Sequence, residues 1–318
     1  MLAAQEFQAV ILAGFGSRLY PLADGDTVPK ALLPVANRPM IAYQLEWLEE
    51  ANIRDIIIAA YPGARGKING VVQSMYEGST EARVQIVEVP ENCGSADALR
   101  SIKSRIKVEE SHNDCLFYDA GNLEANSDRP VSKDDGLGEF IGIDDQSSRL
   151  LIMASKADLD DCLELRTSLI EKFPVIHIHS QLRDAHLYIF RRWVIDLVVK
   201  DRNISILSTN LDLFGRAMLY STSGHEPTPH NVTCNAVVYR DGFTARGNTI
   251  WSYSELNRHV IKNSTDVRVQ ASSEVSAKTQ VGQDSLVGEG SKIDERCSVK
   301  KICDWQPLHY RQKRQAHQ

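Results

Sequence analysis

The sequence lacks the features that would place it among membrane or secreted proteins. It contains no apolar run near the roughly 20 residues that a membrane-spanning helix needs. No basic residue precedes the first apolar stretch, at 7–13, as the start of a signal peptide would require. We therefore expect a cytosolic protein that has no membrane partner.

The chain also lacks an excess of positive charge and the cysteine spacings of zinc sites. Its formal net charge at pH 7 is −6, which argues against a general nucleic-acid surface. The cysteines contain no C-x-x-C pair, so reduced thiols are favoured over a zinc site or a disulfide framework. They are Cys93, Cys115, Cys162, Cys234, Cys297 and Cys303. We predict neither direct nucleic-acid binding nor a metal site.

What the sequence does contain is an alternation of strand and helix patterns at its start. Apolar runs at 7–13 and 56–60 are typical of strands buried on both faces. Helices are predicted from Pro39 onward, with Ile41, Leu45 and Leu48 on one face, and over 95–106. Further elements are predicted as strands at 84–89, 116–118, 140–143, 150–153, 175–180 and 185–190 and a helix at 193–199. This alternation predicts an α/β fold with a mostly parallel sheet.

A six-residue repeat occupies the stretch 269–304 near the end of the chain. Each hexad begins with Val or Ile, and the fifth position is small in most of them. The leading residues are Val269, Val275, Val281, Val287, Ile293 and Val299. Such a period is the signature of a parallel β-helix with about three hexads per turn. About two turns are few for a solenoid, so we expect this segment to pack against something else.

These patterns divide the chain into three predicted regions. An α/β domain is expected over 1–262, shortened around the polar stretch 124–138. The β-helix is expected over 263–304. The polar and basic stretch 305–318 breaks the six-residue period, and we predict a disordered tail there.

A glycine-rich loop after the first strand carries the pattern with most chemical content. Gly14 and Gly16 have no Cβ, so the backbone there can approach a phosphate and point N–H groups at it. Ser17 adds a hydroxyl donor, Arg18 a planar guanidinium suited to pyrophosphate oxygens, and Lys30 a point charge. The order G-x-G-S-R-L-x-P-L followed by P-K-x-L-L-P-V is far more specific than a lone G-x-G.

Residues 9–41 resemble the signature of the sugar-phosphate nucleotidyltransferases. Gly94-Ser-Ala-Asp-Ala-Leu99 resembles that family's base- and sugar-side loop, which adds Gly94 and Asp97 to the candidate nucleotide-binding residues. The resemblance implies a nucleotidyltransferase-like, Rossmann-like α/β domain. It also implies that the hexads form a left-handed β-helix.

Over most of 6–303 the chain is similar to a narrower family, the gamma subunits of translation initiation factor 2B. The similar segments are 6–10, 41–43, 94–100, 149–155, 184–188, 246–257 and 284–288. Asp184-Ala-His-Leu-Tyr188 discriminates best, because transferases usually carry Asn-Ala/Ser-Gly-x-Tyr there. The resemblance implies a scaffolding subunit of a guanine-nucleotide exchange factor. Its partners would be the epsilon subunit, other subunits and initiation factor 2, with exchange activity mainly in epsilon.

The positions at which a transferase would hold its metal lack carboxylates. The family's Gly-Asp is Gly121-Asn122 in this chain, and the segment matching Asp-x-Gly-Thr is 245–249, which has Arg246 and no acid. Magnesium prefers carboxylate oxygens, so we predict no catalytic residue, no metal and no enzymatic activity. Asp119 could replace the first carboxylate if the preceding strand is shorter.

Three functions stay open at this point. The favoured one is the scaffolding subunit. A second is an active sugar-1-phosphate guanylyltransferase of the GDP-mannose type, and a third is a sensor that binds GTP or a nucleotide sugar without turnover. The loop residues around Arg18 and Lys30 could bind nucleotide or be vestigial. His177 and His179 alternate on a strand and are interpreted as an ordinary strand pair.

The chain departs from the gamma subunits at two places. The relatives carry a helix and a strand where only the short polar stretch 124–135 is present in this chain, and they continue the hexads beyond Asp304. Both departures indicate a shortened form.

Overall fold

The computed structural model describes most of the chain and divides it into two interleaved compact units. The described residues are 7–24, 27–76, 82–91, 93–107, 114–119, 139–155, 167–200, 234–240, 243–263, 272–277, 279–282, 285–288, 290–299 and 309–310, with isolated positions between them. Unit 1 comprises 1–12, 53–62 and 82–246, and unit 2 comprises 13–52, 63–81 and 247–318. This division does not follow the predicted domain limit at 262, which stays a prediction.

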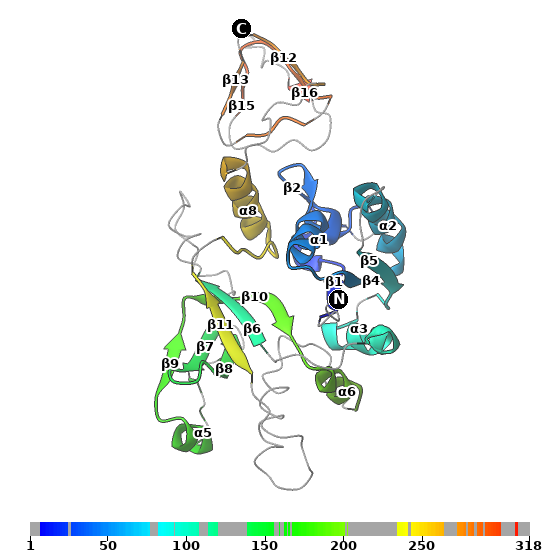
Figure 1. Ribbon diagram of the computed structural model, residues 1–318. Coiled ribbons are helices and arrows are strands. Elements are labelled where there is room, and N and C mark those ends of the chain that lie inside the picture. Colours follow the sequence, from blue (N-terminus) through cyan, green and yellow to red (C-terminus); the bar gives the residue numbers. More distant parts are fainter. Residues whose placement is uncertain are drawn as a thin grey trace. The chain divides into compact units, whose positions relative to one another are not determined.

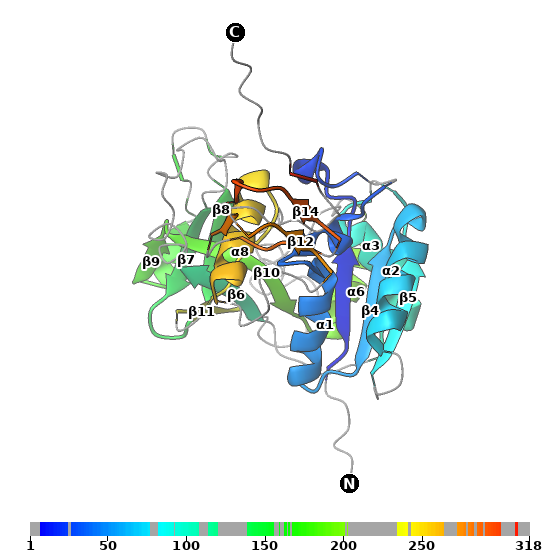
Figure 2. The same cartoon turned by 90° about the horizontal axis from the view of Figure 1, so that it is seen from above.

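The first sheet of unit 1 contains β1 (Ala9–Ala13), β4 (Asp55–Ala60) and β5 (Arg83–Glu88) in the order β1-β4-β5. The three strands run side by side, and β4 and β5 pair in parallel, as the alternating pattern predicted (Figure 2). Every residue of the central strand β4 is buried. The same prediction is wrong for β1, where Leu12 is 39% exposed. The reason is position, because β1 lies at the edge of this sheet among the described residues.

Helix α3 (Ser95–Ile102) packs its apolar face on this sheet. The cluster contains Ile57, Ala59, Val89, Ala98, Leu99 and Ile102. A 3-10 turn at Lys103–Arg105 replaces the last helical turn that the apolar pattern had predicted. Helix α3 also contacts α6 (Arg192–Lys200), whose Val194 and Val198 pack against Ala96.

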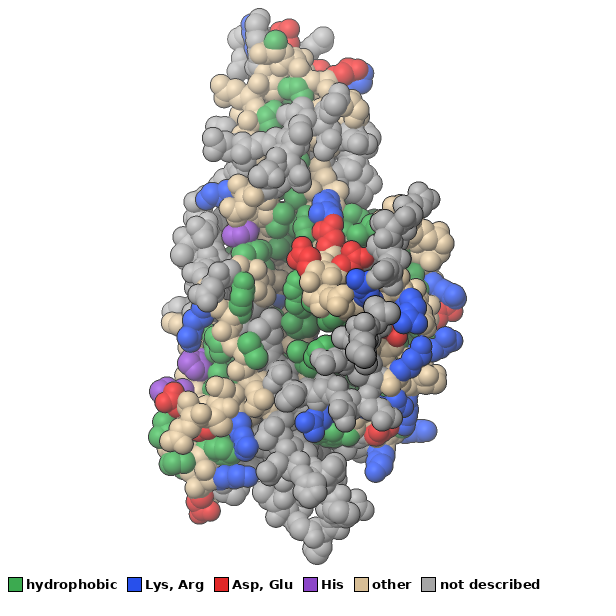
Figure 3. Space-filling view, in the orientation of Figure 1, with side chains coloured by type: hydrophobic (Ala, Val, Ile, Leu, Met, Phe, Trp, Pro, Cys, Tyr) green, Lys and Arg blue, Asp and Glu red, His purple; other side chains and the backbone are tan. Residues whose placement is uncertain are grey.

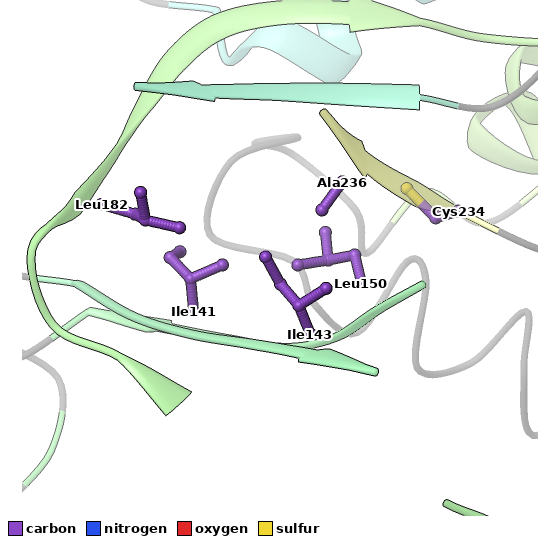
Figure 4. Packing of buried hydrophobic residues seen from close by; sticks show 6 residues of the cluster. All are labelled: Ile141, Ile143, Leu150, Leu182, Cys234 and Ala236. Carbon is purple, nitrogen blue, oxygen red and sulfur yellow. The ribbon is translucent and has the colours of Figure 1, made fainter. Parts of the chain in front are cut away.

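The remaining strands of unit 1 form two further sheets. β6 (Asp114–Asp119) pairs antiparallel with β10 (Leu182–Ile189) and parallel with β11 (Asn235–Tyr239). β7 (Glu139–Asp144) pairs antiparallel with β8 (Leu150–Ser155) and β9 (Ile176–His179), and helix α5 spans Thr167–Lys172. Apolar side chains from these strands and Cys234 meet in one core, which Figure 4 shows. Tyr188 of the cluster described below packs against this core.

Unit 2 begins with the glycine-rich loop, which is followed by a β-hairpin with a two-residue turn. The hairpin joins β2 (Pro34–Val35) to β3 (Arg38–Pro39), and its turn residues Ala36 and Asn37 have positive φ angles of 47° and 66°. Two positive φ angles are the mark of a type I′ turn. Helix α1 (Met40–Glu50) follows Pro39 and buries Ile41, Leu45 and Leu48, which confirms the predicted face.

Two other helices of unit 2 were not predicted from the sequence. They are α2 (Pro62–Tyr76) and α8 (Ile250–Asn263). Gly66 and Gly70 weaken the helical pattern of α2, although Ala64, Ile68 and Val72 are spaced four residues apart and buried. For α8, the sequence signal that could have predicted the helix is a pair of capping residues at its start, which is described below.

The hexads form short strands that pair in parallel with strands three hexads further along the chain. These strands are β12 (Glu274–Val275), β13 (Gln280–Val281), β14 (Lys292–Ile293) and β15 (Ser298–Val299). Glu274 pairs with Lys292 and Gln280 with Ser298, so each partner is three hexads further along the chain. The leading residues share a core of Val275, Val281, Val287, Ile293 and Val299, and the small residues Ser285 and Ser291 are fully buried. Figure 1 shows these strands as sides of a three-sided coil beyond α8.

One pair of residues corrects the prediction of a wholly disordered tail. β16 (His309–Tyr310) pairs in parallel with Lys292–Ile293 of β14. A parallel edge offers backbone donors and acceptors to any extended segment that reaches it, whatever its side chains. The rest of the stretch 305–318 lies outside the described residues.

Several other sequence predictions fall on residues that the structure does not describe. These are the loop 124–138, Asn122, Val269, Cys303 and the side chain of Cys115. In the described part of the chain, Cys93, Cys162, Cys234 and Cys297 lie outside any disulfide. No helix among the described residues is long and apolar enough to cross a membrane.

Candidate functional site

The glycine-rich loop turns sharply at Gly16 and brings the chain against Lys30. Gly16 has a φ angle of +79°, in the left-handed region that side chains disfavour. A Cβ atom at this position would lie 2.6 Å from the Cβ of Lys30. Both the backbone angle and the close approach therefore require glycine. At Gly14, by contrast, an added Cβ would meet nothing within 4 Å.

Lys30 meets a residue from the far end of the sequence. Its Nζ donates a hydrogen bond of 2.7 Å to Oδ1 of Asn248, and the pair is partly buried. Lys30 begins a single 3-10 turn at Lys30–Leu32, whose N-cap is Pro29. Pro29 thus restricts the backbone at the start of the turn, and Asn248 holds the ammonium end of the Lys30 side chain.

Asn248 itself is held by a capping box at the start of α8. Oγ1 of Thr249 accepts a hydrogen bond of 3.1 Å from the backbone N–H of Ser252. Oγ of Ser252 accepts bonds from the backbone N–H groups of Thr249 (3.0 Å) and Asn248 (3.2 Å). This reciprocal pattern satisfies N–H groups that the first turn of a helix leaves without intrahelical partners. The spacing Thr249-x-x-Ser252 is the sequence signal that would have revealed α8.

Side chains on one face of α8 hydrogen-bond to the backbone at 34–36, a few residues after Lys30. The hydroxyl of Tyr253 donates to the carbonyl of Pro34, and Oδ1 of Asn257 accepts a 3.0 Å bond from the backbone N–H of Ala36. Ile261, one turn further, packs with Ala36 and with Leu286 of the hexads. The residues at 246–257 that resemble the gamma subunits therefore serve to anchor the loop.

The other loop candidates lie at the surface. Ser17 and Arg18 belong to a 3-10 turn at Ser17–Leu19, and both are exposed, whereas Leu19 is fully buried. Leu19 packs with Ala23 and Leu33 and so anchors the turn. The guanidinium of Arg18 is thus presented to solvent by a fixed backbone.

Gly94 and Asp97 belong to unit 1, whereas the glycine-rich loop belongs to unit 2. Gly94 is the N-cap of α3, and its carbonyl accepts the first helical hydrogen bond, from Ala98 at 3.0 Å. Asp97 pairs with Arg100, whose Nε also donates to the carbonyl of Val198 in α6 at 2.7 Å. The carboxylate of Asp97 is therefore already engaged in the contact between α3 and α6.

Of the candidate metal positions, the structure describes the backbone of Asp119 and the segment 245–249, and that segment contains no carboxylate. Asp119 is the last residue of β6, and Asn122 lies outside the described part. No group of three His, Cys, Asp or Glu side chains suited to a metal occurs among the described residues. Burial raises the pKa of Glu139, and the positive charges of Arg246 and Arg183 oppose that rise. Arg246 therefore lies near an acid, although its own segment has none.

The discriminating motif Asp184-Ala-His-Leu-Tyr188 forms a hydrogen-bonded cluster. Asp184 is 2% exposed and accepts bonds from the backbone N–H of His186, at 2.8 Å, and from the Tyr188 hydroxyl. Nε2 of His186 lies 3.3 Å from Asp184 Oδ2, and the backbone N–H of Asp184 donates to Glu139. His186 has a positive φ angle of 54°, at the position where the transferase pattern carries glycine.

The two histidines of β9 are close together but do not form a ligand set. The rings of His177 and His179 are stacked with centroids 6.5 Å apart, and Nε2 of His177 lies 3.8 Å from Oδ1 of Asp145. The interpretation as a strand pair agrees with this arrangement.

Comparison with known proteins finds two related groups. The profile of the nucleotidyl transferase family matches residues 8–125. The chain is 32% identical to the gamma subunit of translation initiation factor eIF2B from Schizosaccharomyces pombe, over 83% of this chain and 67% of that protein. It is 28% identical to the same subunit from Dictyostelium discoideum, over 62% of this chain and 53% of that protein. A mannose-1-phosphate guanyltransferase from Debaryomyces hansenii is 26% identical over 64% of this chain and 57% of that protein.

The fission yeast comparison also bears on the length of the chain. The match to this subunit extends over 313 positions but covers only 83% of the 318 residues of this chain. The relative therefore has residues within the match that have no counterpart in this chain.

Among solved structures, the inositol-1-phosphate CTP transferase from T. maritima has a TM-score of 0.55 and 11% identity, covering 81% of this chain and 97% of that one. This likeness shows a nucleotidyltransferase-like α/β fold.

Proposed function

The chain belongs to the family of the gamma subunits of translation initiation factor eIF2B, and from this premise we propose that it acts as a non-catalytic scaffolding subunit of that exchange factor. Its partners would be the epsilon subunit, the other subunits and initiation factor 2, in the cytosol. The observation that carries this proposal is the 32% identity to the fission yeast subunit over 83% of the chain. The similarity to guanyltransferases is lower and covers less of the chain.

The hexads give the proposed scaffold a surface for assembly. We propose that they form a short left-handed β-helix, which the parallel pairing at three-hexad spacing and the buried leading residues support. Leu286 packs on Ile261 of α8 and thereby ties the coil to the rest of unit 2. Because about two turns are few for a solenoid, we propose that this segment packs against a partner.

Charge supports protein partners over nucleic acid. The net charge is −6, and on the face drawn in Figure 3 acidic side chains gather over α1. Nucleic-acid surfaces concentrate positive charge instead. We therefore propose no direct contact with nucleic acid.

We further propose that the loop binds the phosphates of a nucleotide without turnover. The candidates are Gly14, Gly16, Ser17, Arg18 and Lys30, and their support is the tight turn at Gly16 and the anchored lysine. Loss of charge at the metal positions, where Asn122 and the segment 245–249 carry no carboxylate, disfavours transfer chemistry.

Co-purification tests the scaffolding role directly. The tagged chain is expressed beside a tagged longer gamma subunit in the same cytosol, and the bound proteins are identified by mass spectrometry. We expect the epsilon subunit with both baits. Recovery of epsilon with the longer subunit alone would contradict the proposal for this chain.

The second candidate function is an active guanylyltransferase, favoured by the match of residues 8–125 to the nucleotidyl transferase family. It predicts magnesium-dependent release of pyrophosphate from GTP and mannose-1-phosphate. Asp119→Ala should abolish that release if Asp119 holds the metal. A measurable rate that disappears in this variant would establish the enzyme and overturn the non-catalytic role.

A further inference from the structure

The glycine-rich loop exposes an aromatic ring directly after the residue that anchors it. Tyr20 is 71% exposed, the highest value among the large apolar side chains in the described part of the chain. Phe15 and Leu22, which precede and follow it in the sequence, are 39% and 41% exposed. Single exposed apolar residues are common on soluble proteins. Three within eight residues concentrate apolar surface on this one loop.

The backbone around Tyr20 is fixed, although its ring is exposed. Leu19 is fully buried and packs in one cluster with Leu33. The backbone N–H of Tyr20 donates to the carbonyl of Ser17 at 3.3 Å, and that of Leu22 donates to the carbonyl of Leu19 at 2.7 Å. These bonds hold the point from which the ring projects. A ligand that contacts the ring therefore has little additional chain to order on binding.

A guanidinium and an aromatic ring are presented two residues apart on this turn. Arg18 and Tyr20 are both exposed, and the buried Leu19 lies between them. Two residues of backbone span at most about 7 Å, so one small ligand can reach both side chains. A guanidinium binds phosphate oxygens, and a phenol ring stacks on a planar ring. Together the two groups match a nucleotide, which carries both phosphates and a base, better than an inorganic phosphate.

We propose that Tyr20 is a binding residue of the loop, whose ring stacks on the base of a nucleotide while Arg18 contacts the phosphates. This inference rests on the proposed binding of phosphates by the loop and names the class of ligand. Stacking recognises the face of a base, so it favours nucleotides over inorganic polyphosphates without selecting one base. It does not depend on the scaffolding role, which partner binding tests separately.

Calorimetric titration of the full chain with GTP and with inorganic tripolyphosphate tests the stacking. Both ligands carry three linked phosphates, but only GTP carries a base. We expect GTP to bind more tightly, by about 5- to 150-fold, which is the range that stacking of a base on an aromatic side chain supplies. Tyr20→Ala should reduce the affinity for GTP to that for tripolyphosphate, whose binding should not change. Tyr20→Phe keeps an aromatic ring and should keep the difference between the ligands.

Further controls separate the ring from the charge. Arg18→Met should lower the affinity for both ligands alike, because both are held by their phosphates. Trp47→Ala removes another exposed aromatic ring, 48% exposed on α1, and should change neither affinity. Added salt should weaken the binding of both ligands, whereas their ratio should persist because stacking is not screened. The thermal unfolding midpoint of Tyr20→Ala should equal that of the unaltered chain, since the ring is exposed.

Four outcomes would overturn the inference. Equal affinities of the unaltered chain for GTP and tripolyphosphate would remove the stacking and leave phosphate binding in place. Equal losses for both ligands in Tyr20→Ala, with a lowered midpoint, would show that Tyr20 only supports the loop. Loss of the epsilon subunit from Tyr20→Ala in co-purification, with the affinity for GTP kept, would assign the ring to a protein contact. Binding of neither ligand at millimolar concentration would remove the phosphate proposal as well, while the scaffolding role would stand on its own test.

Discussion

Lys30 and Asp97 both belong to motifs predicted to bind a nucleotide, but different kinds of group contact their charged atoms. Lys30 in unit 2 is held by the neutral amide of Asn248. Asp97 in unit 1 is held by the cationic Arg100, which also bonds to the carbonyl of Val198. The amide of Asn248 carries no charge to cancel that of Lys30, whereas Arg100 pairs with the carboxylate of Asp97 and also joins α3 to α6. The comparison shows that a matching motif fixes a residue type, whereas its neighbours fix what that residue can still bind.

The largest effect should come from the turn that places Lys30. Gly16→Ala forces a side chain into a left-handed backbone and against the Cβ of Lys30, so we expect a loss of about 2–4 kcal/mol in the free energy of unfolding. Denaturant titration monitored by circular dichroism measures it. Gly14→Ala is the matched control and should stay within about 0.5 kcal/mol, because nothing lies within 4 Å of the added Cβ. Equal losses at both glycines would mean that the loop does not depend on this approach.

The Asp97 side of the comparison can be broken at Arg100. Arg100→Met keeps the length of a side chain that is 17% exposed but removes its bonds to Asp97 and to Val198. Because the bonds involve a charged donor, we expect a loss of about 1.5–3 kcal/mol. Lys103→Met removes a neighbouring contact to α6, the exposed pair with Asp196 at 3.0 Å, and should cost at most about 1 kcal/mol. A larger loss at Lys103 would contradict this ranking.

The Lys30 side can be sharpened at the capping box that holds Asn248. Thr249→Ala removes the acceptor for the backbone N–H of Ser252, and we expect a loss of about 1 kcal/mol. Adding Ser252→Ala should cost less than the sum of the two single changes, because the two side chains serve one box. Ser254→Ala, at an exposed position of the same helix, is the control. Strict additivity would indicate two independent contacts.

The smallest expected effects concern Glu139 and Asp144, two acids of unit 1 whose pKa values their surroundings shift in opposite directions. Burial raises the pKa of Glu139, so the folded protein holds this proton more tightly than the unfolded chain does. Stability is therefore lost as pH rises from the ordinary glutamate pKa of about 4.3 through the raised value. Glu139→Gln removes that loss, and the variant should gain stability relative to the parent as pH rises toward 7.

Asp144 provides the control of opposite sign. The Ser147 hydroxyl donates to its carboxylate and lowers its pKa, so ionisation favours the folded protein. Asp144→Asn should be less stable than the parent at pH 7, and the difference should shrink as pH falls below about 3.9 through the lowered value. Thermal unfolding of both variants between pH 3 and 7 measures the two trends. Trends of the same sign would refute the assigned causes.

Local patterns predicted the elements wherever the apolar period was clear. The buried run of β4, the face of α1 and the core of the hexads follow from spacing alone, because burial selects residues at fixed intervals. The approach failed for α2 and α8, where glycines or polar residues dilute the period. It also misjudged β1, because whether a strand is central or at an edge depends on what pairs with it.

The sequence by itself determined the α/β character, the six-residue period and the glycine-rich motif at 14–18, because each is encoded within a few neighbouring positions. Only the tertiary structure decided that Lys30 contacts the neutral amide of Asn248, that Arg100 bonds to the carbonyl of Val198, and that the backbone of Asp184 bonds to Glu139. The physical reason is that compensation of a charge depends on groups within hydrogen-bond distance in space. For Lys30 that group lies 218 residues away along the chain.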